Sequence, residues 1–125
     1  MNPALTARLI AAGRVGFGVG LVLVPARLAG PWLGGDADAA GTQVAVRGLG
    51  ARDVALGAGA LVVPESELRP WVAAAIVADL TDLVVTVAAG DALPRAGRVL
   101  VGAVASAGVA FGATALAGLR SDTSA

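Results

Sequence analysis

Four stretches of predominantly apolar residues take up most of the chain, and they constrain its fold more than any other feature. A transmembrane helix needs about 20 such residues, because each residue advances the helix by about 1.5 Å and the hydrocarbon core is about 30 Å thick. Pro, Gly and Asp residues interrupt the apolar sequence between the stretches. We therefore predict one all-α domain over residues 1–125, an integral membrane four-helix bundle with spans at Leu5–Val24, Gln43–Val63, Pro70–Gly90 and Arg98–Leu119.

The composition favours a membrane protein over a soluble one. Hydrophobic residues make up 57% of the chain and charged residues only 14%, whereas a soluble domain carries about 25% charged residues. Two alternatives remain open: a soluble, wholly buried helical bundle, and a cleaved signal peptide formed by the first stretch, in which Arg8 precedes the apolar run. Arg14 interrupts that run, which favours an uncleaved first helix.

The missing residue types restrict the chemistry. The chain has no Cys and no His, which excludes thiol nucleophiles, imidazole acid–base catalysis and the usual zinc ligands. We predict no catalytic residue, no cofactor and no metal site. The formal net charge is zero and no basic run indicates a nucleic-acid partner. An enzyme with Asp79 or Asp82 as general base beside Arg52 is the least favoured alternative.

Ionisable residues occur in the middle of the apolar stretches. Arg14, Arg52, Asp53, Asp79 and Asp82 lie roughly 13–18 Å from the ends of their stretches, close to the centre of a bilayer. An Arg or Asp at a helix centre costs roughly 2.5–3.5 kcal/mol on insertion, so these residues must face other helices. We predict an intramembrane polar cluster that comprises Arg14, Arg47, Arg52, Asp53, Asp79, Asp82 and Thr86.

Helix geometry suggests how this cluster pairs. Asp79 and Asp82 are three residues apart and share one helix face, whereas the consecutive Arg52 and Asp53 point about 100° apart. The simplest arrangement has Arg52 forking onto Asp79 and Asp82, with Asp53 facing Arg14. In this arrangement Arg47 and Arg52 are exchangeable, and with Arg47 included the cluster is neutral.

The cluster has two interpretations. In the favoured one it is a polar latch that fixes helix register, and the protein is a non-enzymatic accessory or assembly protein within a homo-oligomer or a larger membrane complex. In the alternative, the cluster lines a cavity for a proton, an ion or a small polar ligand. The protein would then be a small proton-coupled transporter that uses Asp79 and Asp82.

Small residues recur at a spacing that allows helices to approach closely. Gly16-x-x-x-Gly20 in the first stretch and Gly108-x-x-x-Gly112 in the fourth fit this pattern. We expect them to serve packing within the bundle before dimerisation.

The chain resembles the four-helix bacterial membrane proteins grouped as DoxX-like. The resemblance rests on Pro25-Ala26-Arg27-Leu28 after an Arg-bearing first helix, on Arg47-Gly48-Leu49-Gly50-Ala51-Arg52-Asp53 followed by Leu56-Gly57, and on Asp79 and Asp82. It implies a four-helix bundle. Some DoxX-like proteins are linked with quinone-dependent oxidation or redox-stress complexes, but no residue of this chain matches a quinone motif.

We expect a multi-pass protein of the bacterial inner membrane, embedded in the lipid bilayer. The arginines near the span ends do not fix its orientation, because Arg8, Arg69 and Arg120 on one side are matched by Arg27, Arg95 and Arg98 on the other. The free α-amine adds a positive charge on the side of the termini, so we predict cytoplasmic termini.

Overall fold

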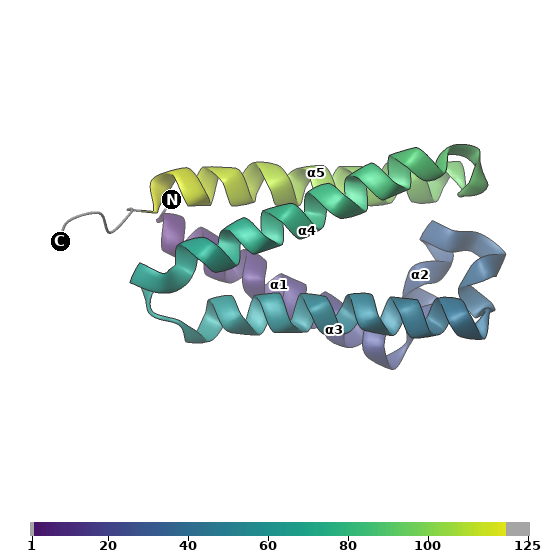
Figure 1. The fold of residues 1–125 in the computed structure, drawn as a ribbon, viewed down its shortest axis with the longest axis horizontal. Coiled ribbons are helices and arrows are strands. Elements are labelled where there is room, and N and C mark those ends of the chain that lie inside the picture. Colours follow the sequence, from purple (N-terminus) through teal and green to yellow (C-terminus); the bar gives the residue numbers. More distant parts are fainter. Residues whose placement is uncertain (1, 120–125) are drawn as a thin grey trace.

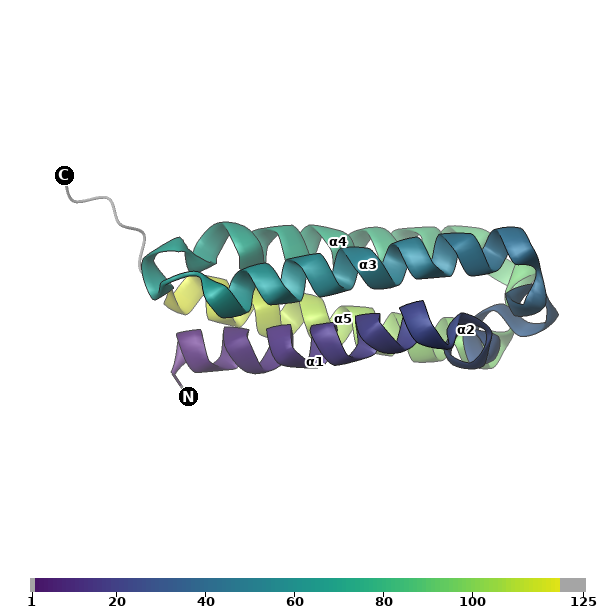
Figure 2. The ribbon, with the colours of Figure 1, turned by 90° about the horizontal axis from the view of Figure 1, so that it is seen from below.

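The computed structural model describes residues 2–119, and in this range the chain is helical with short connections and no strand. The α-helices are α1 (Pro3–Leu23), α2 (Pro25–Leu33), α3 (Ala40–Val62), α4 (Leu68–Ala89) and α5 (Arg95–Gly118). Short 3-10 helices connect them: η1 (Gly34–Asp38), η2 (Glu65–Glu67) and η3 (Gly90–Ala92). The four long helices run side by side, and α2 lies at one end of the bundle (Figures 1 and 2).

The all-α prediction is confirmed, but the described residues form five α-helices and not four. The four long helices overlap the four apolar stretches, and α2 falls in the connection that was expected to be a loop. Pro25 occupies the start of α2, where its missing N–H leaves no hydrogen bond unmade. Pro31 lies inside this nine-residue helix. Pro25 separates α1 from α2, because α1 ends at Leu23 and Val24, the residue before the proline, is not helical.

Three helical segments are long and apolar enough to cross a membrane: Pro3–Leu23, Glu65–Ala92 and Arg95–Gly118. Helix α3 has 23 residues and is therefore about 35 Å long, but it carries Arg47, Arg52 and Asp53 and is not among them. Helix α3 is thus the polar member of the bundle, and its charged residues need partners on other helices.

Helices α1 and α3 pack through backbone contact. A Cβ on Gly18 would lie 2.6 Å from the carbonyl oxygen of Gly50, and a Cβ on Gly50 would lie 2.6 Å from that of Gly18. Two turns further along, a Cβ on Gly57 would lie 2.6 Å from the carbonyl oxygen of Ala11. Only glycine allows these helices to come so close.

The predicted Gly16-x-x-x-Gly20 strip does not form this interface. Gly16 has no neighbour within 4 Å of an added Cβ, and Gly20 contacts Leu28 of α2. The prediction that Gly108-x-x-x-Gly112 serves packing within the bundle is confirmed, because Gly108 and Gly112 of α5 both face α4. These α5 glycines pack within the bundle.

Large apolar side chains cover the outside of the bundle. They come from all four long helices and include Leu9 (59% exposed), Val62 (81%), Val87 (68%) and Val99 (65%). Exposed apolar surface on this scale is rare on soluble monomers. It suits helices surrounded by lipid.

Three arginines hold the C-terminal ends of neighbouring helices. They donate to backbone carbonyl oxygens as follows: Arg8 to Ala60, Leu61 and Val63 at the end of α3, Arg69 to Leu116 and Leu119 at the end of α5, and Arg47 to Val22 at the end of α1. A cation is favoured there because the last carbonyls of a helix have no partner within the helix and carry partial negative charge. Arg120, which the orientation argument used, lies outside the described residues.

Candidate functional site

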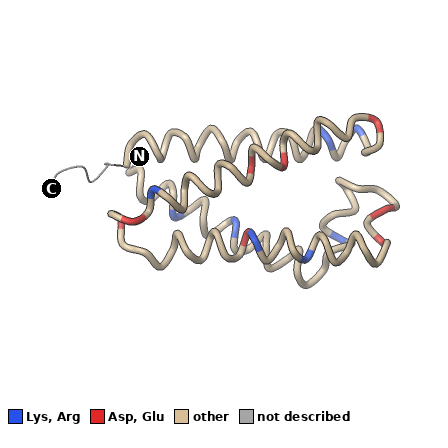
Figure 3. Tube along the Cα trace, viewed as in Figure 1, with Lys and Arg blue, Asp and Glu red and all other residues tan. Residues whose placement is uncertain are grey.

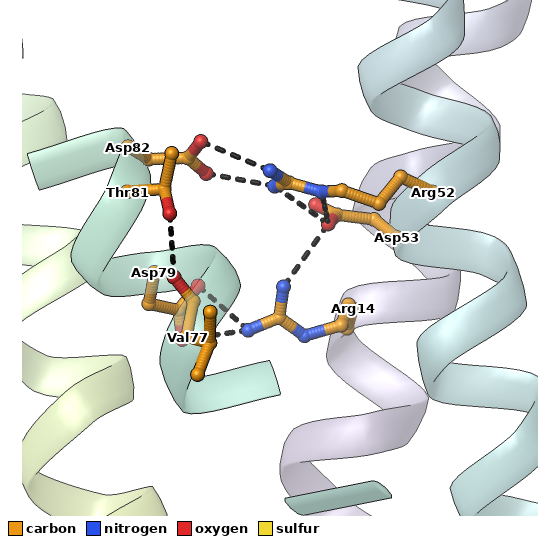
Figure 4. A network of polar contacts seen from close by, with 7 residues as sticks. All are labelled: Arg14, Arg52, Asp53, Val77, Asp79, Thr81 and Asp82. Carbon is orange, nitrogen blue, oxygen red and sulfur yellow. Dashed lines mark hydrogen bonds and ion pairs between the residues drawn. The ribbon is translucent and has the colours of Figure 1, made fainter. Parts of the chain in front are cut away.

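Charged residues of three helices lie near the middle of the bundle (Figure 3), and the side chains of five of them meet there (Figure 4). We call them the charge network: Arg14 of α1, Arg52 and Asp53 of α3, and Asp79 and Asp82 of α4. Their positions follow from the sequence, since each lies close to the centre of a long helix. The network joins α1, α3 and α4.

Arg14 is the central donor of the network. Its NH1 donates to Asp53 Oδ1 at 3.0 Å, and its NH2 donates to Asp79 Oδ1 at 2.7 Å and Oδ2 at 2.6 Å. The Arg14 side chain is only 9% exposed. One buried guanidinium thus links α1 to both α3 and α4, as Figure 4 shows.

Arg52 forms a fork with Asp82. Its NH1 lies 3.0 Å from Asp82 Oδ1 and its NH2 lies 2.7 Å from Asp82 Oδ2, the two-bond geometry that guanidinium and carboxylate groups favour. Nε and NH2 of Arg52 also donate to Asp53 Oδ1, at 3.2 and 3.0 Å. Asp53 Oδ1 therefore accepts hydrogen bonds from both arginines.

The predicted pairing is correct for Arg14 with Asp53 and for Arg52 with Asp82, but it is wrong for Asp79. Asp79 binds Arg14 and not Arg52. The two aspartates share a face of α4, yet they are about 4.5 Å apart along the helix axis. That separation brings each aspartate to a different arginine.

Two residues of the predicted cluster lie outside the charge network. Arg47 binds the end of α1 through the Val22 carbonyl oxygen at 3.1 Å. Thr86 is buried on α4, at 1% exposure, and its hydroxyl has no hydrogen-bond partner in the described part of the chain. The spacing correctly placed Thr86 inside the bundle, but its side chain does not reach the arginines.

The charge network is not neutral. With Arg47 outside it, two guanidinium groups face three carboxylate groups, so one negative charge is in excess when all five are ionised. In addition, none of the hydrogen bonds within residues 2–119 reaches Asp53 Oδ2. The network has an unused acceptor as well as an unmatched charge.

Gly108 of α5 is a further residue of the site, and sequence reasoning assigned it only to packing. A Cβ at this position would overlap Asp79 Oδ2. Helix α5 supplies no charge here but leaves the space that the Asp79 carboxylate fills. The Gly108-x-x-x-Gly112 spacing indicated a close approach without showing that a charged group would use it.

A cavity of about 480 Å³ adjoins the charge network. Arg14, Asp53, Asp79 and Asp82 form one part of its wall. The rest is mainly apolar and comes from four helices, with Ile10, Phe17 and Leu21 of α1, Leu28 and Trp32 of α2, Leu49 of α3, and Leu100, Val101 and Val104 of α5. The short helix α2, which was not predicted from the sequence, thus forms part of the cavity wall.

The chemistry available at this site is that of charge and hydrogen bonding. Within residues 2–119 no group of three or more His, Cys, Asp or Glu residues is arranged to hold a metal ion. Carboxylates can take up a proton or a cation, and guanidinium groups stay charged. The site therefore offers reversible neutralisation of its excess negative charge.

Comparisons with known proteins do not identify a family. No protein-family model matches the chain, and searches of curated proteins and of solved structures find no match either. The resemblance to DoxX-like proteins stays a prediction.

Proposed function

We propose that the chain is a small proton-coupled carrier and not an enzyme, with the charge network as its exchange site. One observation carries this proposal: a charge network with one negative charge in excess, buried at Arg14, Asp53 and Asp79 and partly exposed at Arg52 and Asp82, adjoins a cavity within the bundle. Ionisable groups at membrane depth commonly mark proton and ligand paths. Here they also have a space in which a ligand fits.

The excess charge gives the proposal its physical basis. An unmatched charge in a low-dielectric interior is costly, because little solvent is present to stabilise it. Either a proton on a carboxyl group or a cationic ligand in the cavity would remove that cost. A site that accepts one or the other can couple movement of the ligand to movement of a proton.

The proposed carrier spans the bilayer four times, with α3 as the fourth span. The polar contacts of Arg14 with Asp53 and of Arg52 with Asp82 support this, since they give the charged centre of α3 partners on α1 and α4. Four spans place both termini on one side. We propose cytoplasmic termini in a bacterial inner membrane.

A second candidate is the accessory or assembly role. Each carboxylate of the charge network already has an arginine partner, which is what a latch between helices requires. In this case the two arginines would stabilise all three carboxylates, and no proton or ligand would bind to and leave the network. The partner would be another copy of the chain or a larger membrane complex.

Infrared spectroscopy separates the two candidates. We would record difference spectra of the purified protein between about pH 5 and pH 8, the range in which shifted carboxyl groups titrate. The carrier predicts a protonated-carboxyl band that changes in Asp53→Asn, Asp79→Asn or Asp82→Asn. Asp36→Asn is the matched control, because Asp36 is an exposed aspartate of η1. A band assigned to none of the three network aspartates would refute proton exchange and leave the latch.

A further inference from the structure

We propose that the ligand of this cavity is an organic cation with a single positive charge and an apolar body. This inference rests on the proposed function and names the ligand class of the same site. It follows from three features of the cavity: the sign of its polar wall, the character of its other walls, and the side on which it opens.

The polar wall calls for positive charge. Three aspartates, Asp53, Asp79 and Asp82, line the cavity together with one arginine, Arg14. The charge network as a whole has one positive charge fewer than negative charges. Asp53 Oδ2 accepts no hydrogen bond among the described residues. The hydrogen bonds within the protein therefore leave this wall incomplete.

The remaining walls call for an apolar body. They are formed mainly by aliphatic side chains, with the rings of Phe17 and Trp32 in addition. Aromatic rings attract cations at their faces and pack against apolar groups at the same time. A volume of about 480 Å³ is within the usual range of small-molecule sites.

The cavity opens toward the outer surface of the bundle. Phe17, Leu100 and Val104 line it, and these residues are 52%, 52% and 63% exposed. They belong to the same apolar surface that suits contact with lipid. A ligand that enters from the bilayer must dissolve there, so a small hydrated ion does not fit this route as well as a lipophilic cation does.

The probes are tetraphenylphosphonium and tetraphenylborate, which have nearly the same shape and opposite charge. We would measure their binding to the purified protein in a neutral detergent by titration calorimetry. We expect tetraphenylphosphonium to bind roughly tenfold or more tightly than tetraphenylborate, a difference of about 1.4 kcal/mol or more. Asp53→Asn should reduce this preference. Equal affinity for the two probes would overturn the assignment of a cation.

Two glycines of α1 provide a matched pair that tests the location. Neither has an atom within 4 Å of an added Cβ, so both have open space where a side chain would begin. Gly13 lines the cavity, whereas Gly16 does not. We expect Gly13→Leu to abolish tetraphenylphosphonium binding and Gly16→Leu to leave it unchanged. Binding that survives Gly13→Leu in a folded protein would place the cation elsewhere and overturn the proposal.

The outcomes also separate this inference from the proposed function. A titrating network carboxyl in the infrared spectra without tetraphenylphosphonium binding would overturn the cation ligand and keep proton exchange. Tetraphenylphosphonium binding that is lost in Gly13→Leu, without a titrating carboxyl, would support the ligand class and overturn proton coupling.

Discussion

Replacing Arg14 by Leu should destabilise the protein more than any other single change in the charge network. Asp79 would lose both of its hydrogen bonds to an arginine, while Asp53 would keep those from Arg52. The Arg14 and Asp79 side chains are 9% and 12% exposed, so the stranded carboxylate stays buried. Removing one partner of a buried ion pair costs about 3–5 kcal/mol. Arg52→Leu should cost less, because Arg52 and Asp82 are 31% and 23% exposed.

A double-mutant cycle measures the pairing itself. Asp79→Leu alone strands Arg14 only in part, since Arg14 retains Asp53. The double variant Arg14→Leu/Asp79→Leu removes both charges and should recover much of the loss, with a coupling energy of about 1–3 kcal/mol. The free energy of unfolding is measured by denaturation in mild detergent, with helicity as the readout.

The control cycle combines Arg52→Leu with Asp79→Leu. No hydrogen bond joins Arg52 to Asp79, and only Asp53 and Arg14 connect them through the network, so their coupling should be clearly smaller. A coupling of Arg52 with Asp79 that equals or exceeds that of Arg14 would refute the arrangement described above. The arrangement would also be refuted if the losses of stability in Arg14→Leu and Asp79→Leu simply added in the double variant.

Three further predictions concern packing, helix ends and topology. Gly108→Ala should lower stability by about 1–3 kcal/mol, because the added Cβ displaces the Asp79 carboxylate. Gly48→Ala, on the open side of α3, should be neutral or stabilising by up to about 1 kcal/mol. Thermal unfolding measures both effects, and equal effects would contradict the close contact of Gly108 with Asp79. Arg8→Leu should speed amide hydrogen exchange at the C-terminal end of α3, where its three hydrogen bonds are lost, and unchanged exchange would count against this role. Single cysteines at Gly35 and Ser66 should react with an impermeant reagent from opposite faces of the membrane, and labelling from the same face would exclude four spans.

The sequence was sufficient for the long helices because membrane insertion leaves few alternatives. An apolar run of about 20 residues must satisfy its backbone hydrogen bonds internally, so it becomes a helix. The predicted span Pro70–Gly90 corresponds to α4 at Leu68–Ala89, a difference of one or two residues. Helix α2 was missed for the opposite reason: nine residues with two prolines carry no such constraint, and contacts with its neighbours determine its conformation.

The members of the charge network were more predictable than their pairing. The free-energy cost of placing a charged side chain in lipid was enough to predict that the central charges face one another. Which arginine meets Asp79 depends on the rotation of α1 and α4 about their axes and on how the rise of about 4.5 Å from Asp79 to Asp82 is matched by the neighbouring helices. Spacing along one helix does not give either quantity. Arg47 was misplaced because the C-terminal carbonyls of α1 compete for it, and that competition is visible only once the helices are packed.

The exchange of one positive charge at the network is the central claim, and proton release on cation binding tests it most directly. Tetraphenylphosphonium is added to the purified protein in weak buffer, at a pH where the infrared spectra show the protonated carboxyl, and a pH-sensitive dye reports the protons released. The account predicts close to one proton released for each cation bound, and a marked decrease in Asp53→Asn. Full binding of the cation without release of a proton would contradict it.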